Sequence, residues 1–392
     1  MRRLLPKLLA LIAVFVVFAV AIAWYGVKVP PYAGDLTRLG GYSEHDYGWT
    51  EPQLRFDPPL YRAHVFDEPA DVLIIGDSMS LHRHGEQTDP GTYWPNFLAA
   101  RTGWRIAALH RNEWTMDQVL ALPQYRRTPP RILILQFAER AVVALERTIA
   151  TYAGSGDCIL APSGALAAPA LDAEPLAVAP EAYARLQPGE RGGIDFSRGA
   201  NHLRQTVVRM IAPGLSSVRS FELGRGGLFS SRRDRRLLVY RDDLLKVGMS
   251  EQRLDAQRCA LTALRGAVQA AGSTHMMILV VPDKLTAYYA ELSDPPMDYP
   301  DVFGALSAGG TLELPRLDRV FARAAAAGGI DLFMPNDSHP GATGQMLIAD
   351  AAYRALVDRG IAAPHGDSAT TRHQHRADRQ HAIEDGRGAE RQ

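Results

Sequence analysis

Short apolar runs recur along the chain and alternate with segments of helical periodicity. The clearest runs are residues 72–75, 132–136 and 276–281, and weaker ones lie at 105–109 and 329–333. All are short and rich in leucine or β-branched residues, which is typical of strands buried on both faces of a parallel sheet. The runs therefore predict a buried sheet.

Helical patterns occupy the intervals between these runs, at residues 117–122, 140–151, 252–271, 316–327 and 343–357. Strands that alternate with helices predict an α/β domain with a mostly parallel central sheet. Ligands in such domains bind beyond the carboxyl ends of the strands. Residues 76–78, which follow the first run, are expected at such an end.

The N-terminal segment, residues 1–28, has the pattern of a membrane anchor. Basic residues precede an uncharged run at 8–27, which as a helix would be about 30 Å long and would cross the hydrocarbon core. Trp24 and Tyr25 stand at its far end, where aromatic rings favour the interface. This pattern predicts a single-pass protein of the inner (cytoplasmic) membrane with its domain in the periplasm. Alanines at 19, 21 and 23 leave a cleaved signal peptide as the alternative.

Beyond the anchor we expect one domain over residues 29–364, with a loop-rich insertion at about 153–200. Residues 365–392 are polar and cannot bury enough apolar surface to offset the entropy of ordering, so we expect a disordered tail whose histidines are solvated. Cys158 and Cys259 are the two cysteines of the chain. They form a disulfide in an oxidising compartment or remain unpaired thiols.

Composition narrows the function classes. The 392 residues are 46% apolar and 22% charged, with a formal net charge of zero. A neutral chain has no strong overall attraction to nucleic acid, so we expect no nucleic-acid partner. The sequence has no phosphate-binding glycine loop, CxxC pair or HExxH spacing, and we expect neither a metal nor a cofactor.

Two short motifs carry candidate chemistry. Gly76, Asp77 and Ser78 end the first apolar run, although turns after strands use the same residue types. Asp337 and His339 flank one serine just ahead of the last predicted helix. A carboxylate two positions from an imidazole can hold its Nδ1–H while Nε2 points elsewhere.

Together these motifs predict a catalytic triad. Serine is a poor nucleophile until a positioned base takes its proton, and the base needs an acceptor that selects its tautomer. We therefore predict Ser78 as nucleophile, His339 as general base and acid, and Asp337 as the residue that orients His339. The alternative is a turn serine, a helix-capping aspartate and an incidental histidine.

The motifs resemble those of the SGNH (GDSL-type) hydrolases, a superfamily of serine-dependent esterases and acyltransferases with a three-layer fold. Three further segments, ILILQFAER, LFSSRRDRRLLVYRDD and MMILVVPDKLTAYY, resemble the SGNH-like acetyltransferase domains of alginate O-acetylation proteins (AlgJ/AlgX type). The resemblance covers roughly residues 71–359. In those domains the Asp-x-His precedes the serine and a tryptophan follows the histidine, whereas here Ser78 comes first and Pro340 follows.

The resemblance implies that Ser78 takes up an acetyl group and passes it to a hydroxyl of an extracytoplasmic polysaccharide. It also implies a membrane-bound acyltransferase as the acetyl donor. A carbohydrate acetylesterase is the first alternative, because it shares the same acyl-enzyme. A non-catalytic, glycan-binding assembly subunit is the second.

Other residues near the predicted strand ends are candidates for binding the substrate or the oxyanion. They are Asp77, Asn112, Gln136, Arg140 and Lys284. The Ser78 backbone N–H is the expected first oxyanion donor, and the loop at 110–112 would supply a second. Arg140 and Lys284 would hold a substrate carboxylate or orient the site, or else would form ordinary ion pairs.

Three further groups have both a functional and a structural interpretation. His82 and His84 are rival bases, although residues so close to a nucleophile seldom face it. Tyr93, Trp94 and Trp104 would stack on sugars or pack in the core. The arginine-rich segment at 204–246 suits a polyanionic glycan, or is a solvated surface or a membrane-proximal patch.

Overall fold

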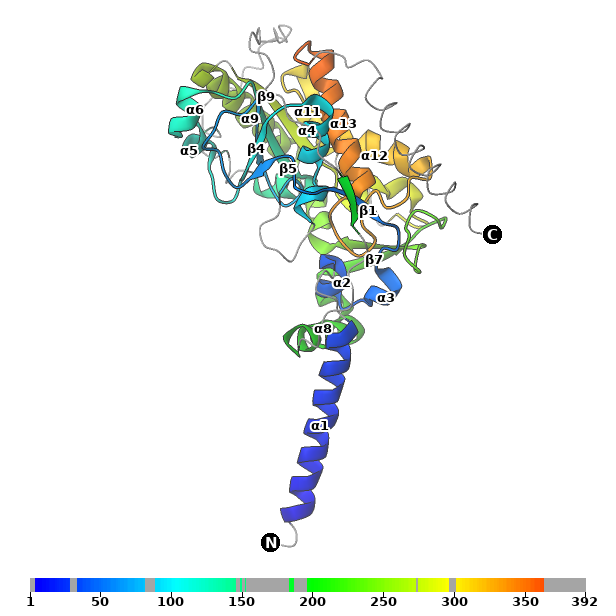
Figure 1. Ribbon diagram of the computed structural model, residues 1–392. Coiled ribbons are helices and arrows are strands. Elements are labelled where there is room, and N and C mark those ends of the chain that lie inside the picture. Colours follow the sequence, from blue (N-terminus) through cyan, green and yellow to red (C-terminus); the bar gives the residue numbers. More distant parts are fainter. Residues whose placement is uncertain are drawn as a thin grey trace, which may run out of the picture.

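The computed structural model describes residues 4–28, 34–81, 89–145, 149, 152, 183–186, 196–272, 274–295 and 301–362. At its centre is a five-stranded parallel sheet in the order β2-β4-β3-β5-β9 (Figure 1). The strands are β2 (Arg62–Ala63), β3 (Val72–Gly76), β4 (Ile106–His110), β5 (Ile132–Ala138) and β9 (His275–Val281). The predicted α/β class and mostly parallel sheet are confirmed.

Helices cover both faces of this sheet. One face carries α4 (Trp94–Thr102), α12 (Leu317–Ala326) and α13 (Ala342–Asp358), which pack on one another. The other carries α5 (Met116–Ala121), α6 (Pro123–Arg127) and α9 (Glu251–Gly272), and α11 (Val302–Ser307) contacts α9 (Figure 1). A sheet between two helical layers buries both of its faces, which is why its strands are almost wholly apolar.

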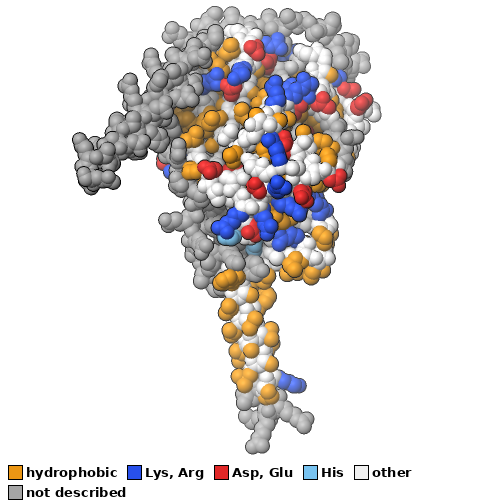
Figure 2. All heavy atoms as spheres, turned by 90° about the vertical axis from the view of Figure 1, so that its right-hand side faces the viewer, with side chains coloured by type: hydrophobic (Ala, Val, Ile, Leu, Met, Phe, Trp, Pro, Cys, Tyr) orange, Lys and Arg blue, Asp and Glu red, His pale blue; other side chains and the backbone are white. Residues whose placement is uncertain are grey.

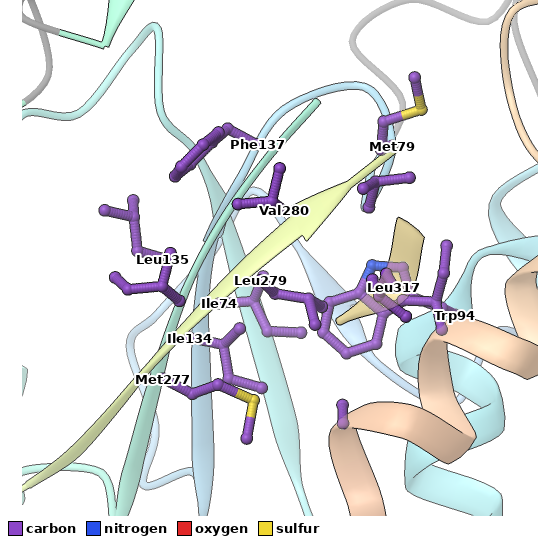
Figure 3. Packing of buried hydrophobic residues seen from close by; sticks show 14 of the residues in the cluster. Ile74, Met79, Trp94, Ile134, Leu135, Phe137, Met277, Leu279, Val280 and Leu317 are labelled. Carbon is purple, nitrogen blue, oxygen red and sulfur yellow. The ribbon is translucent and has the colours of Figure 1, made fainter. Parts of the chain in front are cut away.

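β3 is the middle strand, and Val72, Leu73 and Ile74 are fully buried. Figure 3 shows Ile74, Leu135 and Met277 from three parallel strands within one core, with Trp94 and Leu317 from the helical layer packed beside them. Because β3 is central, the residues that follow it emerge at the middle of the carboxyl edge of the sheet.

The strand predicted at 329–333 is wrong. Asp331 takes a positive φ of 50°, and Phe333 makes only an isolated bridge with Pro340. The Phe333 N–H donates to the Tyr288 hydroxyl over 3.3 Å, so the backbone of this segment is satisfied outside the sheet. The predicted helix at 140–151 also differs, because its described part begins as the 3-10 helix η2 (Glu139–Ala144).

Several elements lie outside the central sheet. β1 (Gln53–Phe56) pairs antiparallel with β6 (Tyr183–Leu186), and β7 (Val218–Glu222) pairs antiparallel with β8 (Arg236–Tyr240). The predicted insertion at 153–200 thus holds β6 and the start of α8 (Phe196–Ile211). Its other residues and the tail at 365–392 lie outside the described residues. The remaining short helices are α2 (Asp35–Gly40), α3 (Glu44–Tyr47), α10 (Lys284–Ala287), η1 (Pro90–Thr92), η4 (Pro213–Leu215), η5 (Arg241–Gly248), η6 (Tyr289–Glu291) and η7 (Ala308–Gly310).

The N-terminal residues form α1 (Leu4–Lys28), a 25-residue helix that projects from the base of the domain (Figure 1). Its described side chains are mostly apolar and exposed (Figure 2). Among the residues whose side chains are described, none belongs to a helix long and apolar enough to cross a membrane. Cys259 on α9 is disulfide-bonded, and the other cysteine, Cys158, lies outside the described residues.

Candidate active site

Asp77 and Gln136 hold the turn that follows β3. The Asp77 carboxylate accepts hydrogen bonds from the Met79 N–H (3.0 Å), the Ala138 N–H (2.8 Å) and Gln136 Nε2 (3.0 Å). Gln136 Oε1 accepts from the Asp77 N–H (3.0 Å) and from Ser80 Oγ (2.5 Å). Two of the candidate ligand-binding residues, Asp77 and Gln136, therefore bind each other and the backbone.

Gly76 leaves the room that this turn needs. A Cβ atom at this position would lie 2.8 Å from the Ser80 side chain and 2.9 Å from Gln136 Oε1. Burial alone would raise the pKa of Asp77, but Arg111, whose Nε lies 3.6 Å from Asp77 Oδ2, and the hydrogen-bond donors outweigh burial and lower it. Asp77 therefore stays ionised and keeps the turn fixed.

Ser78 stands at the tip of the turn and is half-buried. The N–H groups of Ser80 and Leu81 both donate to the Asp77 carbonyl, over 2.9 and 3.3 Å. Within the described part of the chain, neither the hydroxyl nor the N–H of Ser78 makes a hydrogen bond. A free N–H beside a free hydroxyl is the arrangement that a nucleophile with its own oxyanion donor requires.

Asp337 and His339 form the predicted pair. His339 Nδ1 lies 2.5 Å from Asp337 Oδ1, and the same oxygen accepts the His339 N–H over 2.9 Å. The His339 side chain is only 2% exposed. Its Nε2 has no hydrogen-bond partner among the described residues. The ring thus has one nitrogen fixed by a carboxylate and the other free, as a general base needs.

Asp337 and His339 each favour the charged form of the other. Burial would lower the pKa of His339, but the Asp337 carboxylate and, more weakly, Asp35 raise it above its ordinary value. Burial would likewise raise the pKa of Asp337, but His339 and three hydrogen bonds hold it far below its ordinary range. Asp337 is therefore ionised and stabilises the imidazolium that forms when His339 accepts a proton.

Lys284 supports the loop that carries the pair. Its buried ammonium donates to the carbonyls of Met334 (2.6 Å), Pro335 (2.9 Å) and Asp337 (3.1 Å). Burial lowers the pKa of Lys284 to about 7, against the attraction of Asp337 and nearby carboxylates. Lys284 therefore holds the backbone of the 334–337 segment and does not pair with its neighbour Asp283. This arrangement is compatible with the interpretation in which Lys284 orients the site.

Asp35, at the start of α2, is a site residue that sequence reasoning missed. Its backbone N–H donates to Asp337 Oδ2 over 3.0 Å, although the two residues are 302 positions apart. Its carboxylate accepts the Ser338 N–H (2.8 Å) and the Ser338 Oγ–H (2.5 Å). No local pattern marks this aspartate, because all of these contacts are long-range.

Residues next to Asp35, in α2 and at the start of α3, also bond the loop that carries Asp337 and His339. The N–H groups of Leu36 and Thr37 donate to the Asn336 carbonyl over 3.1 and 3.2 Å. Glu44 accepts from Asn336 Nδ2 (2.7 Å) and from the Gly34 N–H (3.0 Å), and burial raises its pKa to about 7. The segment directly after α1 is thus bound to the loop that holds Asp337 and His339.

Side chains of α4 and α13 join the two halves of the site. Trp94 Nε1 donates to Ser80 Oγ over 3.0 Å, and the Trp94 N–H donates to Gln345 Oε1 over 2.9 Å. Gln345 Nε2 reaches the Pro340 carbonyl over 3.4 Å. These contacts run from two residues beyond Ser78 to one residue beyond His339, although Ser78 and His339 are not themselves hydrogen-bonded.

Arg140 belongs to a buried group of charges beside this edge. Its NH1 lies 3.2 Å from Asp243 Oδ1 and 3.4 Å from Asp283 Oδ1. Lys246 Nζ lies 2.8 Å from Glu139 Oε2 and 3.0 Å from Asp283 Oδ2. Arg140 is thus already paired with carboxylates, and its charge also lowers the pKa of His339 slightly against Asp337.

Asn112 is exposed on the loop after β4. Its N–H donates to His110 Nδ1 over 3.2 Å, and the Arg111 N–H donates to the Gly76 carbonyl over 2.8 Å. The loop therefore lies beside the β3 turn. The Asn112 side-chain amide makes no hydrogen bond to any described residue, which leaves it available to a ligand.

The other residues singled out in the sequence lie apart from these contacts. His82 and His84 are outside the described residues. Tyr93, Trp94 and Trp104 are buried in the core and do not form an exposed stacking wall. Six arginines of the segment at 204–246 are exposed. Four of them lie between β7 and β8 or at the start of β8, namely Arg232, Arg233, Arg235 and Arg236, and the other two are Arg204 and Arg241.

Asp35, Asp337 and His339 are the one group of potential metal ligands within the described residues, with ligand atoms within 4.8 Å of one another. Their oxygens already accept hydrogen bonds from Ser338, from the Asp35 N–H and from His339. A cation would have to displace these donors. The arrangement is that of a hydrogen-bonded pair supported by a second carboxylate.

Comparison of the chain with models of known protein families, with curated proteins and with solved structures gives no match.

Proposed function

We propose that this protein is an SGNH-type serine O-acetyltransferase that modifies an extracytoplasmic polysaccharide. The observation that carries the proposal is the His339 ring, buried and fixed by Asp337 at Nδ1, with Nε2 free. Ser78, with a free hydroxyl at the tip of the central strand, is the nucleophile that this base would serve. The motif resemblance to SGNH acetyltransferase domains gives the reaction class.

The first half-reaction forms an acetyl-enzyme. Ser78 Oγ attacks the carbonyl carbon of an acetyl ester while His339 Nε2 takes the hydroxyl proton. The Ser78 N–H donates to the oxyanion, and one well-aimed donor of this kind is worth about 3–4 kcal/mol. The tetrahedral intermediate then expels the alcohol of the donor, which receives its proton from His339.

The second half-reaction transfers the acetyl group to the glycan. A sugar hydroxyl attacks the acetyl carbon and gives its proton to His339 Nε2. The intermediate collapses, Ser78 leaves as the alcohol with the proton from His339, and the acetylated sugar departs. Water in place of the sugar gives free acetate, which is the reaction of an acetylesterase.

We further propose that α1 holds the protein in the inner membrane, with the domain in the periplasm. The run at 8–27 is uncharged, and side chains such as Leu11, Val14 and Phe15 are more than 60% exposed on α1, where lipid would cover them. A membrane-bound acyltransferase would then supply the acetyl donor on the same membrane.

The proposed function is tested by measuring whether the acetyl group passes to a sugar or to water. The full-length protein in detergent micelles is incubated with 4-nitrophenyl acetate and a panel of uronate and neutral oligosaccharides, and acetylated sugar and free acetate are both measured. The proposal expects acetylated sugar, and its loss in Ser78→Ala but not in Ser293→Ala, an exposed serine on another surface. Free acetate alone would identify an esterase, and no turnover together with retained glycan binding would identify a binding subunit.

A further inference from the structure

Outside α1, the three most exposed large apolar side chains of the described residues lie together at one end of α8. Ile211 is 79% exposed, Met210 75% and Leu215 71%, and Val207 one helical turn earlier is 44% exposed. Positions 207, 210 and 211 follow helical spacing on α8 and share one face, and Leu215 lies in η4, directly after the end of α8. We call these four residues the α8 patch.

The α8 patch is fixed rigidly to the domain. Thr206 Oγ1 donates to the Gly41 carbonyl over 3.1 Å on the side that faces α2. The Arg219 guanidinium donates to the carbonyls of Pro213 and Gly214, and so holds the turn that presents Leu215. These hydrogen bonds hold the backbone of the patch in place. The exposure of its apolar side chains is therefore a property of the fold.

Basic side chains border the patch. Arg204 is exposed one turn before it on α8. The Arg209 guanidinium lies 4.2 Å from the centre of the Tyr42 ring, and Arg219 lies beside Pro213. Apolar residues with arginines around them match an interface in which acyl chains lie beneath anionic headgroups.

The position of α8 agrees with such a surface. α8 packs against α1, and it lies across the end of α1 from which the domain begins (Figure 1). Figure 2 shows apolar side chains at the base of the domain, next to the top of α1, with basic side chains just above them. A bilayer that surrounds α1 would therefore meet α8 along its length.

We propose that the α8 patch inserts into the interfacial layer of an anionic bilayer and fixes the domain against the membrane surface. This inference rests on the proposed membrane location of α1 and is independent of the proposed chemistry. α8 contacts α2 through Thr206, and α2 bonds Asp337 through Asp35. The membrane contact thus supports the same α2 segment that positions the candidate base.

Depth-dependent fluorescence quenching tests the inference in the full-length protein. Ile211→Cys and, separately, Met210→Cys carry an environment-sensitive fluorophore, and the protein is placed in nanodiscs of phosphatidylcholine and phosphatidylglycerol with nitroxide-labelled acyl chains. We expect loss of most of the fluorescence at both positions. Ile330→Cys, an exposed apolar position of the domain outside α8, is the matched control and should keep its fluorescence.

A label at Val14→Cys on α1 separates the two proposals. Quenching at Val14 without quenching at Ile211 and Met210 overturns the α8 patch and leaves the anchor intact, whereas no quenching at any position overturns both. Equal quenching in nanodiscs without phosphatidylglycerol overturns the preference for an anionic surface. Shielding of Ile211 that rises with protein concentration but without lipid quenching would assign the patch to a second copy of the chain, and would also overturn the inference.

Discussion

The backbone N–H of Asp35 donates to Asp337 Oδ2 over 3.0 Å, so the segment that follows the N-terminal helix is part of the candidate active site. This hydrogen bond uses one oxygen of the carboxylate, and the other oxygen holds His339 Nδ1 at 2.5 Å. The base is thus positioned by residues from both ends of the domain. Its reactivity should depend on each of these contacts.

If His339 is the base, the charge of Asp337 should set the pH dependence of activity. Because Asp337 raises the pKa of His339 above its ordinary value of 6.5, and because the base must be neutral, kcat/KM for 4-nitrophenyl acetate should rise with pH through a midpoint above 6.5. Asp337→Asn should move this midpoint to lower pH and reduce kcat by about 10⁴-fold. Asp67→Asn, at an exposed carboxylate, is the control. An unshifted midpoint in Asp337→Asn would exclude His339 as the titrating base.

The raised pKa of His339 also makes the stability of the fold depend on pH, and this stability should fall over the pH range in which activity rises. A histidine whose pKa is raised in the folded state contributes stability that is complete below pH 6.5 and is lost as the pH rises through the folded pKa. Urea midpoints of the wild type and of His339→Gln should therefore converge above that pH. If the urea midpoints of the two proteins differ by the same amount at every pH, the attraction between Asp337 and His339 does not contribute to stability.

We predict that Asp35 acts as a positioning residue for His339. Asp35→Asn removes the charge near His339 and weakens the two acceptor bonds to Ser338, so we expect kcat to fall by up to about 100-fold through misplacement of the base, with KM nearly unchanged. The midpoint of the pH profile should also move to lower pH, because Asp35 raises the pKa of His339. Asp294→Asn, an exposed aspartate, should match the wild type. A purely structural role would lower the urea midpoint but leave the pH midpoint in place.

Lys284 should be important for the stability of the 334–337 segment. Lys284→Met removes the donor of the buried Pro335 and Asp337 carbonyls and one of the two donors of the Met334 carbonyl, which keeps the Asp337 N–H. We expect a loss of about 2–3 kcal/mol in the free energy of unfolding. Arg232→Met, at an exposed arginine, should cost little. Urea denaturation checks both variants, and equal midpoints for the two would contradict the role of Lys284.

Trp94 should couple the serine turn to the histidine loop. Trp94→Phe removes the Nε1 bond to Ser80 but keeps the backbone bond to Gln345, and we expect a cost of about 1 kcal/mol in stability together with a fall in kcat. Trp104→Phe is the control, because Trp104 is equally buried at the opposite end of the strands. A fall in kcat of the same size in both variants would show that core packing, and not this hydrogen bond, is responsible.

The sheet could be predicted from sequence because its strands are short apolar runs buried on both faces. Residues 72–75, 132–136 and 276–281 became β3, β5 and β9 almost unchanged. Residues 329–333, GIDLF, are a weaker apolar run that contains an aspartate, and Phe333 bonds to Tyr288 outside the sheet. Composition predicts burial of such a run and does not determine its hydrogen-bond partner.

The same distinction applies to the candidate site. Asp337 and His339 could be paired from sequence, because two positions separate them in one loop. Asp35 could not, because its contact with Asp337 comes from a backbone N–H at the start of α2. Asp77 and Gln136 were predicted to bind the substrate or the oxyanion, whereas their polar atoms bond each other and the backbone of the turn after β3.

Peptide mapping of the acetyl-enzyme tests most directly whether His339 activates Ser78. The full-length protein is mixed with 4-nitrophenyl acetate, quenched with acid, digested and analysed by mass spectrometry. We predict one acetyl group on Ser78, formed in the wild type and absent in His339→Gln. Acetylation at another residue, or equal acetylation of Ser78 in wild type and His339→Gln, would contradict the account.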